Sequence, residues 1–166
     1  MSKIKLLILL LISLLLASCI KDDINRTSTK FSLAYVGGEL DGLIFKNLLT
    51  GYLEGLNLYD KNSIYEINAE IKHNSNLYIT NQDNTSDRQN ITTSLSINIE
   101  NKTMNCSIFQ NKFSVSQFYI FAPSSQFISN QKATSKIKKS NSEALVKEFV
   151  NKLFTIDGSC SSEKSN

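Results

Sequence analysis

Tryptophan is absent from this sequence, and histidine and proline occur once each, as His73 and Pro123. A zinc site usually takes several histidine or cysteine ligands at short spacing, and the chain has neither a second histidine nor a closely spaced cysteine pair. We therefore expect no metal centre at His73. Catalytic motifs are missing as well, since the sequence has no Gly-x-Ser-x-Gly elbow and no glycine-rich phosphate loop. We expect a protein that is not an enzyme and that holds no cofactor.

Glu66 and Glu70 share the solvent face of one predicted strand. Paired carboxylates can carry out acid–base chemistry. Charged side chains that alternate with apolar ones are, however, the ordinary pattern of a half-exposed strand, and we adopt that interpretation.

Neither sign of charge dominates, because 18 basic residues stand against 15 acidic ones. The distribution is uneven: residues 20–100 carry 7 basic and 11 acidic side chains, whereas residues 101–166 carry 9 lysines and 4 acids. Nucleic-acid binding calls for a strongly basic surface, so we do not expect it here.

One cluster of cations stands out, made of Lys132, Lys136, Lys138 and Lys139. These lysines either contact the phosphates of a lipid headgroup or of lipopolysaccharide, or they keep a helix or loop soluble. Arg88, in a predicted polar loop, has the same two interpretations.

A long apolar run, Leu6–Leu16, is interrupted only by Ser13. As a helix it would rise about 16 Å, roughly half the thickness of a hydrocarbon core, which is too short for a stable membrane span. Because Lys3 and Lys5 precede the run and small residues follow it, the segment has the three regions of a secretory signal peptide.

The run ends in Leu16-Ala17-Ser18-Cys19, which resembles the lipobox of bacterial lipoproteins. This resemblance implies cleavage after residue 18 and a diacylglycerol on the Cys19 thiol, followed by acylation of the new N-terminus. Acyl chains at about 0.8 kcal/mol per buried CH₂ would hold the mature chain on a membrane permanently. Residue 20 is Ile, not the Asp that often retains such lipoproteins at the inner membrane. The resemblance therefore implies the outer membrane of a Gram-negative bacterium.

Two further cysteines are Cys106 and Cys160. Cys106 lies in an alternating apolar stretch, so we expect it to be a small buried hydrophobic residue. A disulfide is compatible with the periplasm and would stabilise the fold by roughly 4 kcal/mol. It would require the polar tail that contains Cys160 to fold back onto one strand, and the sequence leaves this pairing open.

Apolar periodicity predicts four strands and two helices. In the third long strand the phase slips between Ile108 and Phe113, which a β-bulge explains. Ser140 and Glu143 suggest a capping box at the start of the last helix, while residues 130–139 either extend that helix or do not. We expect a strand at 31–36, a helix at 40–56, strands at 63–72, 91–100 and 104–121, the last ended by Pro123, and a helix at 140–154.

These elements predict an α+β two-layer sandwich of order β-α-β-β-β-α, with two helices packed on one face of a four-stranded, mainly antiparallel sheet. We expect Leu95 and Ile97 of a central strand to be buried against Phe149 and Leu153 of the last helix. The predicted organisation is a signal peptide at 1–18, a tether at 19–30, the domain at 31–156 and a polar tail at 157–166.

The lipobox, the helix sequence "LIFKNLLTGYL", the three antiparallel strands and the closing helix "SEALVKEFVNKLF" together resemble the LPS-assembly lipoprotein family, LptE. In that family the domain sits as a plug inside the LptD β-barrel of the outer membrane and helps to deliver lipopolysaccharide to the cell surface. The resemblance implies an LptD-type barrel and lipopolysaccharide as partners.

A free-standing periplasmic or surface lipoprotein that binds lipid or a host or partner protein is the alternative. It would have a hollow between helices and sheet, whereas a plug would have a filled core and a polar outer surface.

Overall fold

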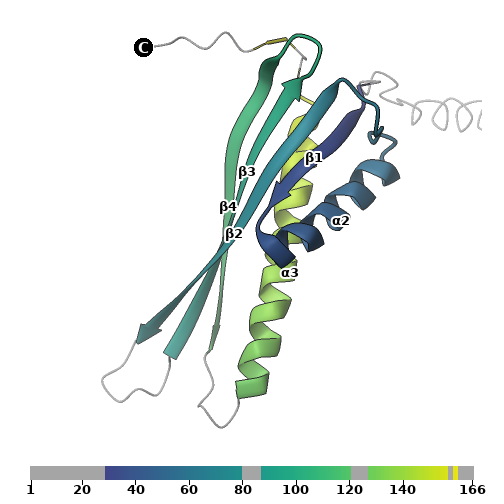
Figure 1. Cartoon of the computed structure of the whole chain (residues 1–166). Coiled ribbons are helices and arrows are strands. Elements are labelled where there is room, and N and C mark those ends of the chain that lie inside the picture. The colour runs from purple at the N-terminus through teal and green to yellow at the C-terminus, as the bar shows by residue number, and fades with distance from the viewer. Residues whose placement is uncertain (1–28, 80–86, 121–126, 157–158, 161–166) are drawn as a thin grey trace, which may run out of the picture.

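The computed structural model describes residues 29–79, 87–120, 127–156 and 159–160. The signal peptide, most of the tether and Pro123 lie outside the described residues. Two helices cover one face of an open four-stranded sheet, as the sequence predicted (Figure 1). Within the sheet the strands lie in the order β1-β2-β3-β4. The elements are β1 (Phe31–Gly37), α2 (Glu39–Gly55), β2 (Tyr65–Ile79), β3 (Asp87–Asn101), β4 (Cys106–Ile120) and α3 (Phe127–Leu153).

The sheet is mixed, because β1 runs parallel to β2 while β2, β3 and β4 form antiparallel pairs. The β2–β3 register runs from Tyr65 opposite Asn101 to Ile79 opposite Asp87. β1 pairs with β2 only as far as Glu70. The sequence predicted shorter strands here, since Lys72–Asn76 has few apolar side chains; antiparallel pairing with β3 continues the strand through this polar stretch.

A β-bulge interrupts the β3–β4 pairing, as the phase slip predicted. Ile99 pairs with Phe109 and Glu100 with Ser107, so Ile108 has no partner in the register. The extra residue reverses the phase of β4, which lets Ile108 and Phe113 both be buried.

The core lies between the helices and the sheet, and the predicted parity of β2 and β3 is confirmed. Every second residue of β3 from Ile91 to Ile99 is buried. Leu95 and Phe149 are both completely inaccessible, and Ile97 and Leu153 are each 2% exposed. Phe149 also contacts the rings of two β4 residues, Phe109 and Phe113, with centroids 6.3 Å apart in each pair.

α2 begins where the sequence predicted, directly after the Gly37-Gly38 break. Gly38 has φ 118°, and a Cβ there would lie 2.5 Å from the backbone oxygen of Ile71. Only glycine fits this close turn from β1 into α2. α2 packs through Phe45, Leu49 and Leu53, all completely buried.

α3 is longer than its apolar pattern indicated, and the predicted capping box is wrong. Ser140 and Glu143 lie in the middle of the helix, which begins at Phe127. Polar residues that disfavour a helix interior are accommodated here by bonds to neighbours: the Ser142 hydroxyl donates to the Lys138 carbonyl at 2.8 Å, and Gln117 Nε2 donates to Ser140 Oγ at 3.2 Å.

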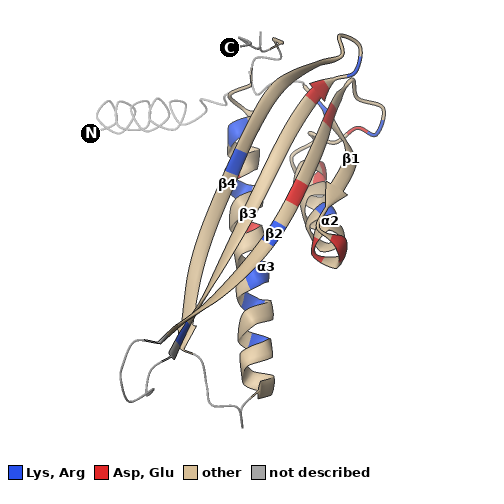
Figure 2. Ribbon diagram, turned by 60° about the vertical axis from the view of Figure 1, so that its left-hand side comes forward, with Lys and Arg blue, Asp and Glu red and all other residues tan. Residues whose placement is uncertain are grey.

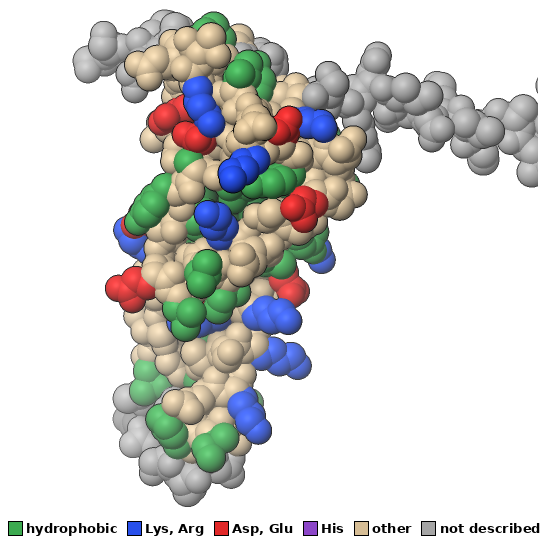
Figure 3. All heavy atoms as spheres, turned by 45° about the vertical axis from the view of Figure 1, so that its right-hand side comes forward, with side chains coloured by type: hydrophobic (Ala, Val, Ile, Leu, Met, Phe, Trp, Pro, Cys, Tyr) green, Lys and Arg blue, Asp and Glu red, His purple; other side chains and the backbone are tan. Residues whose placement is uncertain are grey.

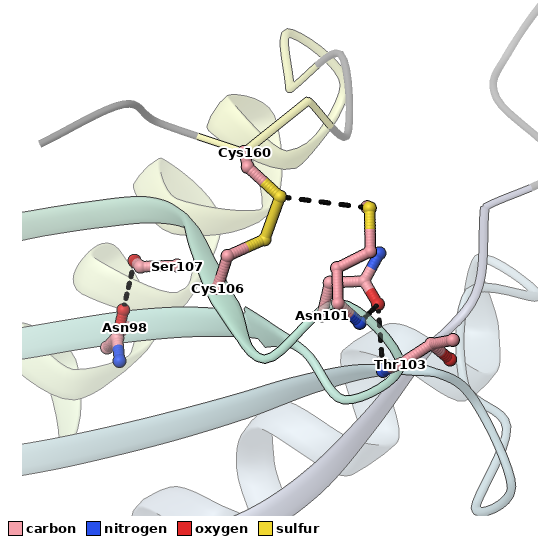
Figure 4. Close-up of a disulfide and its surroundings, with 7 residues drawn as sticks. Asn98, Asn101, Thr103, Cys106, Ser107 and Cys160 are labelled. Carbon is pink, nitrogen blue, oxygen red and sulfur yellow. Dashed lines mark hydrogen bonds between the residues drawn. A yellow bond between two sulfur atoms is a disulfide. The ribbon is translucent and has the colours of Figure 1, made fainter.

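Cys106 and Cys160 form a disulfide with their Cα atoms 5.8 Å apart (Figure 4). The expectation that Cys106 is an unpaired hydrophobic residue is therefore wrong. α3 leads back along the full length of the sheet and ends beside the β3–β4 turn, so the chain after it passes close to the first residue of β4 (Figure 1). Sequence spacing alone could not show this return, because it depends on where α3 ends.

Candidate functional site

The two ends of the molecule differ in composition. β1, the β3–β4 turn and the disulfide lie at one end, and the β2–β3 hairpin and the start of α3 lie at the other, which we call the distal end (Figure 1). α2 covers only the part of the sheet away from the distal end, so the first half of α3 continues beyond it (Figure 1). This uncovered half contains most of the predicted site residues.

The predicted lysine cluster lies along that half of α3 (Figure 2). Lys132, Lys136 and Lys139 are exposed and follow one another at helical spacings of four and three residues, which places them on one face. Lys138 is turned away from this row, and its Nζ donates to Asp41 Oδ2 of α2 at 3.0 Å. We call Lys132, Lys136 and Lys139 the lysine row.

Arg88 lies apart from the lysine row. It is exposed near the distal end of β3, and its even position places it on the face of the sheet opposite the helices. It lines a surface hollow of about 320 Å³ together with Phe118 and Ile120 of β4. The structure therefore does not bring all five predicted cations together.

A polar network joins both helices to the sheet where α2 begins. His73 Nδ1 lies 2.8 Å from Thr93 Oγ1, and His73 Nε2 lies 3.7 Å from Asp41 Oδ2. Asn141 Nδ2 donates to the same Thr93 oxygen at 3.1 Å. Burial lowers the pKa of His73, an effect that Asp41 opposes and Lys138 reinforces. Only two features of the sequence point to this network, and both do so weakly: a lone histidine, and the polar residues Asn141 and Ser142 beside the apolar stripe of the last helix.

A groove of about 550 Å³ lies between the start of α2 and the first half of α3. Leu40 and Ile44 of α2 line one side, and both are more than half exposed. Phe127 and Thr134 line the α3 side, and Tyr119 of β4 lines the groove as well. The groove is thus partly apolar, with the Lys138–Asp41 pair at its edge.

The distal end carries several exposed apolar side chains. The rings of Tyr78 and Phe118 are tilted against each other with centroids 6.4 Å apart, although about half or more of each residue is exposed. Six large apolar residues are exposed at this end: Leu77, Tyr78, Phe118, Ile120, Phe127 and Ile128. Figure 3 shows apolar side chains at the lower end of the molecule, next to the lowest of the basic side chains.

The face of the sheet opposite the helices is polar along its centre. Thr92, Ser94, Ser96 and Asn98 of β3 point to this side, with the β4 hydroxyls next to them. Thr92 Oγ1 and Ser116 Oγ lie 2.7 Å apart, one hydroxyl donating to the other. Charged side chains flank this polar row: Glu66 and Glu70 form ion pairs with Lys102 and Lys72 at 2.8 Å, and Lys112 of β4 lies opposite Ser96.

Within residues 29–79, 87–120, 127–156 and 159–160, no helix is long and apolar enough to cross a membrane. Across the same residues, no group of three or more His, Cys, Asp and Glu side chains is placed to hold a metal ion.

The fold is similar to those of bacterial lipoproteins. The minor lipoprotein of Acinetobacter baumannii matches 78% of this chain and 92% of its own, with a TM-score of 0.58 and 13% identity. Rare lipoprotein B of Shewanella oneidensis matches 76% of this chain and 95% of its own, with a TM-score of 0.61 and 8% identity. At such identities the likeness shows a shared fold. No family model and no curated protein matches the sequence.

Proposed function

We propose that this chain is an outer-membrane lipoprotein, anchored by lipid on Cys19, that acts as a non-enzymatic plug and assembly partner of an LptD-type β-barrel in lipopolysaccharide transport. The observation that carries the proposal is a filled two-layer domain whose sheet has a largely polar outer face, with hydroxyl and amide side chains along β3. The lumen of a wide outer-membrane barrel is itself polar, so the polar central part of this face can lie against it.

The dimensions of the domain also suit a barrel. β2, β3 and β4 have 15 residues each, which gives strands of about 50 Å at about 3.4 Å per residue. This length exceeds the apolar band of an outer-membrane barrel, about 25 Å tall. The domain can therefore extend through the lumen, with its distal end beyond the band.

Lipid attachment at Cys19 is supported by the lipobox and by the cysteine pairing. Cys106 and Cys160 bond to each other, so Cys19 has no cysteine of its own chain left to pair with. Mass spectrometry of the mature N-terminal peptide should show an acyl mass and no residues before Cys19. An unmodified Cys19, or retained residues 1–18, would contradict this part of the proposal.

The alternative, a free-standing periplasmic or surface lipoprotein that binds lipid or a host or partner protein, predicts a hollow between helices and sheet. In the described residues this layer is filled, since Phe45, Leu49, Ile67, Leu95 and Phe149 are inaccessible to solvent. The grooves described above lie on the surface instead. The plug proposal accommodates this packing without a further assumption.

The test is depletion of this protein in its host, followed by measurement of LptD abundance and surface lipopolysaccharide. Binding to a folding barrel would stabilise it by mass action, so both quantities should fall on depletion. A photoreactive residue at Ser96, on the outer face of the sheet, should also cross-link to the barrel. The yield of cross-linked barrel is compared with that from the same residue at exposed Asn151 of α3. Normal levels of both quantities would favour the free-standing lipoprotein.

A further inference from the structure

The outward face of α2 is unusual for a helix that packs on a sheet. Three large apolar residues of its first half are more than half exposed: Leu40 at 69%, Leu43 at 55% and Ile44 at 51%. Its second half carries two exposed glycines, Gly51 and Gly55, one turn apart on the same face. Bulky side chains thus occupy one end of this face, and small residues occupy the other.

The two glycines have no use within the described part of the fold. A Cβ atom added to either would have no other group within 4 Å, unlike at Gly38 and Gly42, where the backbone is in the way. Glycine in an exposed helix interior destabilises the helix relative to alanine. Their presence is explained if another chain approaches this helix closely.

A surface hollow lies over the glycine half of α2. Its volume is about 490 Å³, and it is lined by Asn47, Leu48, Gly51, Tyr52, Gly55 and Leu56. Leu56 is 42% exposed, so the hollow is open to solvent and largely apolar. It lies on the same helix as the protruding Leu40 and Ile44.

We propose that two copies of this chain associate through α2, packed antiparallel, with Leu40 and Ile44 of each copy against Gly55 and Gly51 of the other. The spacing supports this register. The midpoint of the stripe lies between Asn47 and Leu48, and Leu40 and Gly55 are equally far from it, about 11 Å each at 1.5 Å per residue.

Ile44 and Gly51 are likewise equidistant from that midpoint, about 5 Å each. A two-fold axis through the midpoint therefore places each bulky side chain opposite a glycine, as an isologous interface requires. A parallel pair would place bulk against bulk and small against small. Asp41, which would come level with Glu54 in the antiparallel register, is turned toward Lys138 of α3, so these two acids do not oppose the contact.

The contact is small, since one helix of about 22 Å provides less than the roughly 800 Å² per partner of a standard interface. The dimer is accordingly weak in dilute solution and strengthens where two copies are confined to one membrane, which raises their effective concentration. The pairing of α2 does not rest on the proposed barrel partner, which is tested separately by depletion. A copy seated in a barrel lumen would have α2 enclosed, so the dimer is the form of copies that are outside a barrel.

Sedimentation of the full chain in detergent micelles, over a roughly hundredfold range of concentration, tests the proposal. The wild type should show a concentration-dependent dimer. Gly51→Leu should weaken it at least about tenfold, because the leucine meets Ile44 of the other copy. The double variant Ile44→Ala with Gly51→Leu makes residue 44 small and residue 51 large. The leucine of one copy then meets the alanine of the other, so most of the lost affinity should return. Glu148→Leu, at an exposed site on α3, adds the same side chain elsewhere and should change nothing.

Circular dichroism on each variant establishes that the fold is intact. Gly55→Leu, which places a leucine opposite Leu40 of the other copy, is a second variant and should weaken the dimer in the same way as Gly51→Leu. A chain that is monomeric throughout the range would overturn the proposal. A dimer that Gly51→Leu and Gly55→Leu both leave unchanged would exclude α2, and failure of the double variant to recover would exclude the antiparallel register. A monomer in which Gly51→Leu instead reduces recovery of the barrel would assign this face to the barrel.

Discussion

Asn141 in the middle of α3 donates its side-chain amide to Thr93 Oγ1 and to the Ile91 carbonyl of β3, both at 3.1 Å. Asn141 and Thr93 are completely inaccessible to solvent. Replacing Asn141 by alanine removes a donor from two buried oxygens, so the free energy of unfolding should fall by about 1–3 kcal/mol in urea denaturation. Asn151→Ala, at an exposed position of the same helix, should change it by less than about 0.5 kcal/mol. Equal effects of the two changes would show that the bonds to β3 contribute nothing.

His73 should make stability depend on pH. Its folded pKa is lowered by burial from the ordinary value of 6.5, so below about pH 6.5 the unfolded chain binds more protons than the folded one. Stability from this group is complete above pH 6.5 and is lost as pH falls toward the folded pKa, with a slope of at most about 1.4 kcal/mol per pH unit.

His73→Gln should remove this component of the pH dependence. Urea denaturation of both proteins between about pH 4.5 and 8 separates the histidine from the carboxylates, because the difference between the two curves cancels effects that they share. Asp41 of α2 and Lys138 of α3 are the charged groups that act on the imidazole. Parallel curves for the two proteins would contradict the prediction.

Local patterns in the sequence predicted the order of elements, the parity of β2 and β3, and the bulge near Ile108, because alternation and its phase report directly on which side chains face the core. They did not predict the start of α3. Its first half has few apolar residues to bury, and Asn141 is held there by the bonds of its side-chain amide to Ile91 and Thr93 of β3. Sequence periodicity carries no information about such tertiary bonds.

The candidate site was also predicted only in part. The lysine row was recognised because its members are close in sequence. The groove beside it was missed, since Leu40 and Ile44 of α2 fit an apolar stripe that looked like core. α2 instead turns the face with Phe45 and Leu49 toward the sheet, and both side chains are completely buried. Which face of the helix is buried depends on how α2 packs on β1 and β2. The Cys106–Cys160 bond likewise depends on where the chain returns in space.

The disulfide should contribute much of the stability of the domain. It joins residues 54 apart in sequence, and closing a loop of that size constrains the unfolded chain by about 4 kcal/mol at 25 °C. Cys160→Ser, or reduction of the wild type, should lower the free energy of unfolding by up to that amount. Reductant should have no further effect on the variant. A wild type whose unfolding is insensitive to reductant would show that the bond is absent or without effect.

Leu95 lies at the centre of the interface between the sheet and α3. Because it is completely buried, Leu95→Ala should cost about 2–5 kcal/mol, the usual range for a leucine truncated in a core. Ser96→Ala, one position along on the polar face, is the matched control and should have little effect. An unchanged melting temperature for Leu95→Ala would mean that the parity of β3 is wrong.

The lysine row should provide electrostatic affinity for lipopolysaccharide if its function is more than solubility. Near an anionic headgroup surface each exposed lysine contributes about 1 kcal/mol, so replacing Lys132, Lys136 and Lys139 together by glutamine should weaken binding by about a hundredfold at low salt.

Binding of the full chain to lipopolysaccharide micelles, measured by co-sedimentation over a series of salt concentrations, checks this expectation. Wild-type affinity should fall as salt rises, because exposed charges are screened beyond a Debye length of about 8 Å at physiological ionic strength. The triple variant should bind weakly at every salt concentration. Lys147→Gln, an exposed lysine nearer the other end of α3, is the control for a general loss of positive charge. Unchanged binding by the triple variant would leave the lysine row with the role of a solvated helix face.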